Sequence, residues 1–321
     1  MRAAVCTKYG SPENVKVVDL AKPSPKKNEI LVKIEATTVA SGDARIRRAD
    51  PAIIRLIFGF RKPRKSVLGV VVAGKVEQVG ADVTKFKVED RVFGTTGMSF
   101  GAHAEYTCIK ESGTLSIMPE KMEFTEAASI PFGGTAAIHF LRKGKVQKGS
   151  KVLIYGASGA IGTLAIQLAK ELGAEVTGVC SGKNVRMVKN LGADYVIDYK
   201  KDNFSKNGIK YDVIFDTVGK SSFSDGFNSL TKEGKLLLAS ANVGQMIWGG
   251  FRSLFGKRKV ITGVIKETVE DMRYFKKLIE QGKLVPTIDS TYSLSQIAEA
   301  HARVDSGHKK GNVILTMNES K

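Results

Sequence analysis

Cysteine, histidine and tryptophan are scarce in this chain of 321 residues, which has three cysteines, four histidines and one tryptophan. Cys6, Cys108 and Cys180 lie far apart in the sequence, so we expect neither a disulfide framework nor a Cys-x-x-Cys redox motif. Chains without such a framework are typical of reducing compartments, and we expect a cytoplasmic location.

Long apolar runs are also missing. No stretch of about 18 apolar residues occurs, so we expect no segment that spans a membrane. The first residues, MRAAVCTKYG, lack the continuous apolar core of a secretory signal, and we expect no signal peptide.

Acidic residues are too few to balance the basic ones. Lysine and arginine total 50 against 32 aspartates and glutamates, which gives a formal net charge of +18. This excess favours anionic partners such as nucleotide phosphates, nucleic acid or an anionic membrane surface, although most of these charges are expected to form an ordinary solvated surface. A chain of this length that is 42% hydrophobic can bury two cores, so we expect about two domains.

Two hydrophobic patterns divide the chain. Up to about residue 120, short β-prone runs alternate with glycine, proline and asparagine. From residue 151 onward, compact apolar strands such as 151–156 alternate with amphipathic helices such as 160–173. Helices are also expected over 122–144, broken near Pro131 and Gly133, and over 223–234. Apolar strands that alternate with helices predict a doubly wound parallel sheet covered on both faces.

The stretch KVLIYGASGAIGTLAIQLAKELGA carries a phosphate-binding motif. A strand leads into Ala157-x-Gly159-x-x-Gly162, and a helix begins within the motif. Gly159 lets the backbone approach a pyrophosphate, and Gly162 permits close packing of helix on strand. Because the helix N-terminus offers free N–H groups to phosphates, the motif predicts a dinucleotide site.

The end of the next strand predicts which dinucleotide binds. NAD-binding folds commonly place an acid there for the ribose 2′-hydroxyl, but this strand ends Val179-Cys180-Ser181-Gly182-Lys183. Ser181 can donate to a 2′-phosphate and Lys183 can pair with it, which favours NADPH. Tyr199, at the end of the following strand, either packs against the adenosine or is an ordinary strand-end tyrosine.

An ordered set of motifs extends this interpretation to the whole chain. AGKVEQVG (73–80), EDRVFG (89–94), GAHAEY (101–106), AASIPFGGTAA (127–137) and GASGAIG (156–162) together resemble the medium-chain dehydrogenase/reductase superfamily, and most closely its quinone oxidoreductase branch. The resemblance implies a GroES-like β-rich domain of residues 1–122, completed by about 288–321. It implies an inserted Rossmann domain over residues 123–287.

The resemblance also implies site residues. Zinc-containing relatives have a cysteine where Ala40 stands and a histidine where Val70 stands, so we expect no zinc. The family's pocket asparagine and tyrosine are also absent, and Ser41, Asp43 and Arg47 are the remaining catalytic candidates, with helix capping as the alternative for Asp43. The candidate cofactor residues are Thr135, Gly156, Ala157, Ser158, Gly159, Ala160, Ile161, Gly162, Ser181, Lys183, Asn184, Tyr199, Val218 and Ser240.

Zinc-free relatives reduce quinones or α,β-unsaturated carbonyl compounds, and we expect this chain to do so with NADPH. An RNA-binding role and a peripheral membrane role are the alternatives, and nucleic acid is the less favoured partner because the sequence shows no RNA-binding module. Two segments, 49–66 and 246–260, mix apolar and basic residues. Each could be a lid over an apolar substrate, a contact in a homodimer, or a contact with an anionic membrane.

Overall fold

The computed structural model describes residues 1–241, 244–245 and 256–317, which form two units. Unit 1 comprises Met1–Phe132, Thr268–Glu280 and Pro286–Lys321, and unit 2 comprises Gly133–Glu267 and Gln281–Val285. Most of the segment 246–260, including its aromatic residues, lies outside the described residues. No helix in the described part of the chain has both the length and the apolar character needed to cross a membrane.

Unit 1 is built on a largely antiparallel sheet with the strand order β14-β15-β3-β4-β5-β7, in which β6 also pairs with β3. The C-terminal strand β15 lies against β3, so the end of the chain completes a sheet that its first forty residues begin. β1 and β2 form a separate pair. The strands are β1 (Arg2–Cys6), β2 (Val15–Asp19), β3 (Glu29–Val39), β4 (Val71–Val79), β5 (Arg91–Thr95), β6 (Tyr106–Lys110), β7 (Thr114–Ile117), β14 (Ile288–Ser293) and β15 (Asn312–Thr316).

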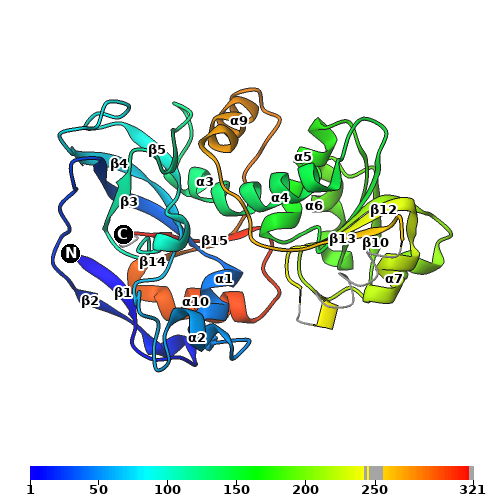
Figure 1. The fold of residues 1–321 in the computed structure, drawn as a ribbon, viewed down its shortest axis with the longest axis horizontal. Coiled ribbons are helices and arrows are strands. Elements are labelled where there is room, and N and C mark those ends of the chain that lie inside the picture. Colours follow the sequence, from blue (N-terminus) through cyan, green and yellow to red (C-terminus); the bar gives the residue numbers. More distant parts are fainter. Residues whose placement is uncertain (242–243, 246–255, 318–321) are drawn as a thin grey trace. The chain divides into compact units, whose positions relative to one another are not determined.

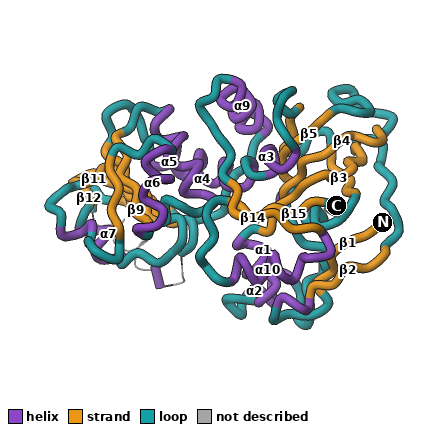
Figure 2. Tube along the Cα trace, turned by 180° about the vertical axis from the view of Figure 1, so that it is seen from behind, coloured by secondary structure: helices purple, strands orange, loops and turns teal. Residues whose placement is uncertain are grey.

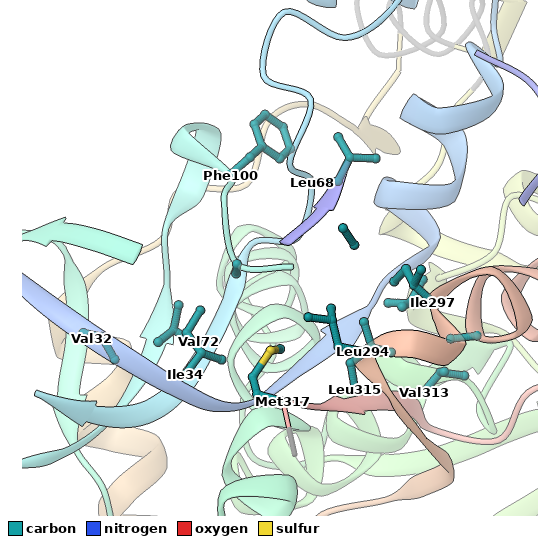
Figure 3. Packing of buried hydrophobic residues seen from close by; sticks show 14 of the residues in the cluster. Val32, Ile34, Leu68, Val72, Phe100, Leu294, Ile297, Val313, Leu315 and Met317 are labelled. Carbon is teal, nitrogen blue, oxygen red and sulfur yellow. The ribbon is translucent and has the colours of Figure 1, made fainter. Parts of the chain in front are cut away.

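Helices close the core of unit 1. Figures 1 and 2 show α1, α2 and α10 gathered beside the β1–β2 pair, and Figure 3 shows Ile297 of α10 packed near Val313 and Leu315 of β15. The alternating side chains of β3, such as Val32 and Ile34, are fully buried in the same cluster. The helices are α1 (Ser41–Arg48), α2 (Ile54–Phe58), α3 (Phe124–Ala128), α9 (Val269–Glu280) and α10 (Ile297–Asp305), with short 3-10 turns η1 (Pro12–Asn14), η2 (Gly97–Ser99) and η5 (Leu294–Gln296).

The unit boundaries differ from those predicted for the domains. The sequence predicted a boundary after residue 122 and a return near 288, whereas α3 and α9 belong to unit 1. α3 packs against β3 and β4, and α9 packs against β7. These are contacts between segments far apart in the sequence, which helical periodicity does not reveal.

Unit 2 is a six-stranded sheet with the order β10-β9-β8-β11-β12-β13, and every neighbouring pair is parallel. This confirms the predicted doubly wound parallel sheet. Figure 2 shows α5 and α6 beside its strands, and α7 packs on β12. The elements are α4 (Pro131–Gly144), β8 (Lys151–Tyr155), α5 (Ala160–Glu171), β9 (Glu175–Cys180), η3 (Gly182–Asn184), α6 (Val185–Asn190), β10 (Tyr195–Asp198), η4 (Phe204–Lys206), β11 (Tyr211–Asp216), α7 (Phe223–Asn228), β12 (Leu230–Leu238) and β13 (Lys259–Ile261).

Two predicted helices have different limits. The helix expected over 223–234 ends at Asn228, because Leu230 is fully buried and pairs with Tyr211 at the start of β12. The stretch 122–144 is broken into two helices as predicted, since α3 ends at Ala128 and α4 begins at Pro131, a favourable first helical position; the break lies before Pro131, and α4 continues through the glycines. A β-carbon on Gly133 would lie 2.5 Å from the carbonyl oxygen of Ala160, so this glycine serves close helix packing.

Candidate functional site

The phosphate-binding motif forms a tight turn between β8 and α5. The amides of Gly156 and Ala157 both donate to the carbonyl of Val179, at 3.1 and 3.0 Å, which fixes the turn against the end of β9. Gly156 has φ +81°, and a β-carbon there would lie 2.7 Å from the Thr217 hydroxyl oxygen. The turn therefore needs glycine at this position.

The two later glycines of the motif have different surroundings. A β-carbon on Gly162 would lie 2.2 Å from the carbonyl oxygen of Gly156, so Gly162 allows α5 to approach the turn. A β-carbon on Gly159 would meet only one atom, the same oxygen at 3.4 Å. The other side of Gly159 is open, which leaves room for a ligand to reach the backbone.

Free backbone donors face this opening at the start of α5. Gly159 is the N-cap of the helix, and its carbonyl accepts the first helical hydrogen bond, from the amide of Thr163 at 3.0 Å. The amides of Ala160, Ile161 and Gly162 precede that bond, so they are the donors that a helix leaves for an anion. The turn therefore fits the pyrophosphate of a dinucleotide.

Asn184 connects this turn to the end of β9. Its side-chain amide donates to the hydroxyl of Ser158 at 2.9 Å, although the two residues are 26 positions apart. Asn184 is only 5% exposed, and its Oδ1 has no hydrogen-bond partner among the described residues. A buried acceptor without a donor is costly, so this atom is suited to a donor that a bound ligand supplies.

The loop after β11 is ordered by Asp216, a residue that is not among those predicted from the sequence. The Asp216 carboxylate is fully buried and accepts hydrogen bonds from the amides of Val218 (2.9 Å), Gly219 (2.8 Å) and Ser221 (3.0 Å). It thereby fixes Val218, a predicted cofactor residue whose side chain is exposed. An acid at the end of an apolar strand, followed by Thr-Val-Gly, is the signal that could have identified it.

A cavity of about 270 Å³ opens beside the ends of β8, β9 and β10. Tyr199 lines it and is half exposed, which fits the predicted packing against adenosine. The charges that line the cavity are balanced, since two lysines and two aspartates contribute to it. The lining residues are Tyr155, Val179, Tyr199, Lys200, Lys201, Asp202, Asn203, Phe204, Ser222 and Asp225.

An acid lies closer to the predicted 2′-phosphate residues than the sequence indicated. No acid follows β9, but Asp198, at the end of β10, has an oxygen 2.6 Å from where a β-carbon of Gly182 would stand. Its other oxygen accepts the amide of Lys200 at 3.1 Å. Lys183 and Ser181 remain beside this turn, with Lys183 exposed and Ser181 partly exposed. The parallel pairing of β9 and β10 brings Asp198 here, level with Cys180.

The predicted cofactor residues of unit 2 thus gather at one edge of the sheet. The motif follows β8, Ser181, Lys183 and Asn184 follow β9, and Tyr199 follows β10. The carboxyl ends of parallel strands share an edge, where ligands of such folds bind. Val218 and Ser240, which follow β11 and β12, complete the set at this edge, whereas Thr135 is fully buried in α4.

Two of the three catalytic candidates are buried inside unit 1. The Asp43 carboxylate accepts the amides of Ala40 (2.8 Å) and Gly69 (3.2 Å), so it caps the start of α1, as the alternative interpretation proposed. Burial raises the pKa of this carboxyl, and the nearby His103 opposes that shift. Ser41 alone is exposed.

Arg47 is fully buried and joins three segments of unit 1. Its guanidinium donates to the Gly10 carbonyl, to the Asp305 carboxylate and, at 3.4 Å, to Nδ1 of His301. Direct contact of Asp43 or Arg47 with substrate stays a prediction, and the burial of both side chains argues against it.

The positions of the zinc ligands in other dehydrogenases lie in the same region. Ala40 is the N-cap residue of α1, and Val70 directly precedes β4. His103, a candidate ligand by type, places its Nε2 2.9 Å from the carbonyl oxygen of Thr38. Within residues 1–241, 244–245 and 256–317, no three His, Cys, Asp or Glu side chains are grouped to hold a metal ion.

Comparison with known proteins identifies the family. Residues 26–120 match the family described as "Alcohol dehydrogenase GroES-like domain", and residues 191–315 match "Zinc-binding dehydrogenase". The "Quinone-oxidoreductase homolog, chloroplastic" of Spinacia oleracea is 32% identical over 319 residues, which cover 95% of each chain. The chain belongs to the quinone oxidoreductase family.

Other members of this family and its relatives agree with the fold. The structure of a quinone oxidoreductase from Coxiella burnetii superposes with a TM-score of 0.89 at 28% identity and covers 99% of both chains. A protein of Arabidopsis thaliana named "NADPH-dependent alkenal/one oxidoreductase, chloroplastic" is 28% identical over 98% of this chain and 79% of its own. The predicted resemblance to the quinone oxidoreductase branch is therefore confirmed.

Proposed function

We propose that this member of the quinone oxidoreductase family is an NADPH-dependent oxidoreductase that transfers hydride to a quinone or an α,β-unsaturated carbonyl compound. The observation that carries the proposal is the phosphate turn, in which Gly159 is open to a ligand and the helix amides that follow it are free. NADPH supplies the hydride when bound, and the protein contributes orientation and electrostatics.

The residues of unit 2 fit the nucleotide in distinct roles. The amides at the start of α5 hold the pyrophosphate, and Asn184 positions Ser158 beside it. Lys183 and Ser181 provide a cation and a hydroxyl for the 2′-phosphate. Asp216 holds the Val218–Ser221 loop in place through backbone amides.

The class of acceptor follows from the groups that unit 1 lacks. Ala40 and Val70 cannot act as ligands to a Lewis acid, and the asparagine and tyrosine common in the family's pocket are absent. Hydride addition to a saturated ketone builds a localised alkoxide, which needs strong stabilisation. A quinone or enone spreads that charge over its own conjugated system, so it needs less help from the protein.

A panel of acceptors tests the proposal. The purified protein is mixed with NADPH and one acceptor at a time, and the loss of NADPH absorbance is followed. We expect turnover with quinones and medium-length enones and little with saturated ketones of the same length. The matched control is Gly159→Val, which fills the open face of the phosphate turn and abolishes turnover. Activity confined to saturated aldehydes or alcohols would refute the assignment.

The cytoplasmic location and the homodimer stay predictions. Cys6, Cys108 and Cys180 are free thiols, which suits a reducing compartment. Burial raises the pKa of the Cys6 and Cys180 thiols to about 11, so neither is a thiolate nucleophile at neutral pH.

A further inference from the structure

Unit 1 presents a compact surface on which apolar and basic side chains alternate. We define the α2 surface as the exposed residues of α2 and its flanks: Ile53, Arg55, Leu56, Ile57, Phe60, Arg61, Lys62, Arg64 and Lys65. Leu56 is 71% and Phe60 is 75% exposed, and Ile53 and Ile57 beside them are also exposed; such a group of exposed apolar side chains is typical of an interaction surface. None of these residues is among the candidate nucleotide residues of unit 2.

The α2 surface is firmly attached to the core of unit 1. Phe58, on the inner side of α2, packs edge-to-face against Phe100 with a ring-centroid distance of 5.8 Å. The Tyr9 hydroxyl donates to the carbonyl of Gly59 at 2.6 Å, and the amide of Arg64 donates to the carbonyl of Phe58 at 2.7 Å. The exposed apolar side chains are therefore held outward by a fixed backbone.

The surface extends onto a second segment. The ammonium group of Lys65 donates to the carbonyl of Met98 at 3.0 Å, which places η2 beside the end of the α2 surface. Met98 is 64% exposed and adds a flexible apolar side chain. Two separate segments of unit 1 thus contribute to one apolar area with a basic border.

The charge on this surface has one sign. The sequence contains no aspartate or glutamate between Asp50 and Glu77, and it has five cations from Arg55 to Lys65. None of these five forms an ion pair with a carboxylate in the part of the chain that the structure describes. A partner for this surface must therefore be both anionic and able to accept aliphatic side chains.

We propose that the α2 surface binds the anionic face of a lipid bilayer. Leu56, Ile57 and Phe60 enter the boundary between headgroups and acyl chains, and the surrounding cations contact lipid phosphates and carboxylates. A second copy of the same surface is a poor partner because its cations would repel. Nucleic acid is a poor partner because isoleucine and leucine do not stack on bases as aromatic residues do.

Flotation with lipid vesicles tests this proposal on the whole chain of 321 residues. Vesicles of phosphatidylcholine alone are compared with vesicles that also contain phosphatidylserine, at low and at high salt. We expect binding to the phosphatidylserine vesicles only, and its loss at high salt. R61Q/K62Q should weaken that binding roughly twenty-fivefold, since each cation near the surface contributes about fivefold. L56S/F60S should weaken it at low salt as well.

The matched control is K85Q/K87Q, which removes the same charge from exposed lysines of unit 1 outside the α2 surface. It should bind vesicles as the unmodified protein does. Equal loss in K85Q/K87Q and R61Q/K62Q would overturn the proposal in favour of a nonspecific effect of net charge.

Two other results would also overturn it: no vesicle binding together with self-association that L56S/F60S abolishes, or no vesicle binding together with a raised KM for the acceptor in L56S/F60S. The first would assign the surface to a dimer contact, the second to a substrate lid. Because vesicle binding is read without turnover, a failed activity assay would leave the lipid result interpretable.

Discussion

The side-chain amide of Asn184 donates to the hydroxyl of Ser158 at 2.9 Å and so connects the turn after β9 to the phosphate turn after β8. Through this bond, the residues predicted to hold the 2′-phosphate and those predicted to hold the pyrophosphate share one scaffold. Asn184 is buried, and its other polar atom is left for a ligand.

Asn184→Ala should weaken NADPH binding about fivefold or more, since it removes a hydrogen bond worth about 1 kcal/mol and frees Ser158 to rotate. Isothermal titration with NADPH measures the change. Asn190→Ala, at the exposed end of α6, is the matched control and should bind as the unmodified protein does. The role of Asn184 is disproved if both variants bind NADPH equally well.

Alanine substitutions at two glycines of the motif should have different effects, one on the stability of the fold and the other on NADPH binding. Gly162→Ala places a β-carbon 2.2 Å from the Gly156 oxygen, so we expect a loss of about 1–3 kcal/mol in the free energy of unfolding. Gly159→Ala meets only an atom at 3.4 Å, so its thermal midpoint should be nearly unchanged while NADPH binding falls. Thermal unfolding and nucleotide titration of both variants check this. A strong loss of stability in Gly159→Ala would contradict the open face assigned to Gly159.

Lys183→Ala should weaken NADPH binding about fivefold and leave NADH binding unchanged, because only NADPH carries the 2′-phosphate that this cation meets. Titrations with the two nucleotides give the ratio. Lys148→Ala removes an exposed lysine that precedes β8, at the opposite edge of the sheet, and should leave the ratio intact. Equal affinity of the unmodified protein for NADPH and NADH would argue against the predicted preference.

His301 should make the protein sensitive to mild acid. Burial, with help from His103, Arg47 and Arg48, lowers its pKa from 6.5 to about 2. The unfolded chain therefore takes up a proton below pH 6.5 that the folded chain does not. The contribution of neutral, buried His301 to the free energy of unfolding is complete above pH 6.5. It falls as the pH drops, with a limiting slope of about 1.4 kcal/mol per pH unit.

His301→Gln can still accept a hydrogen bond from Arg47 but does not titrate. Its unfolding free energy, measured by urea titration between pH 6.5 and pH 4.5, should fall less steeply than that of the unmodified protein. Parallel slopes would disprove the role of His301. Asp289 does not interfere in this range, because its pKa is lowered from 3.8 to about 2 by the Arg303 guanidinium despite its burial, so its contribution is lost only as the pH falls below 3.8.

Zinc should be absent from the purified protein, and a chelator should leave quinone reduction intact. The reason is that Ala40 and Val70 stand where zinc-containing relatives have ligands. Elemental analysis of protein purified without chelators measures the metal content. A stoichiometric zinc that activity requires would contradict the interpretation of both positions.

The sequence by itself determined the parallel sheet, the phosphate turn and the family. Strands such as β8, with Val152, Leu153 and Ile154 fully buried, are apolar on both faces because helices cover both sides, and that composition is visible in the sequence. The glycines of the turn are visible for a similar reason, since Gly156 and Gly162 occupy positions where a β-carbon would clash with nearby atoms.

Only the tertiary structure decided how distant residues meet. Asp198 lies beside Gly182 because β9 and β10 pair in parallel. Asp216 orders the loop after β11 by accepting hydrogen bonds from backbone amides, and these contacts leave no pattern in the sequence because the amide is the same in nearly every residue type. Asp43 and Arg47 were predicted near a substrate, but both are buried. The Asp43 carboxylate accepts a hydrogen bond from the Gly69 amide, and the Arg47 guanidinium donates to the Asp305 carboxylate. The sequence pattern of a segment shows whether its side chains will be buried and which turn it can form. Which distant residues it then contacts depends on strand pairing and packing across the whole domain.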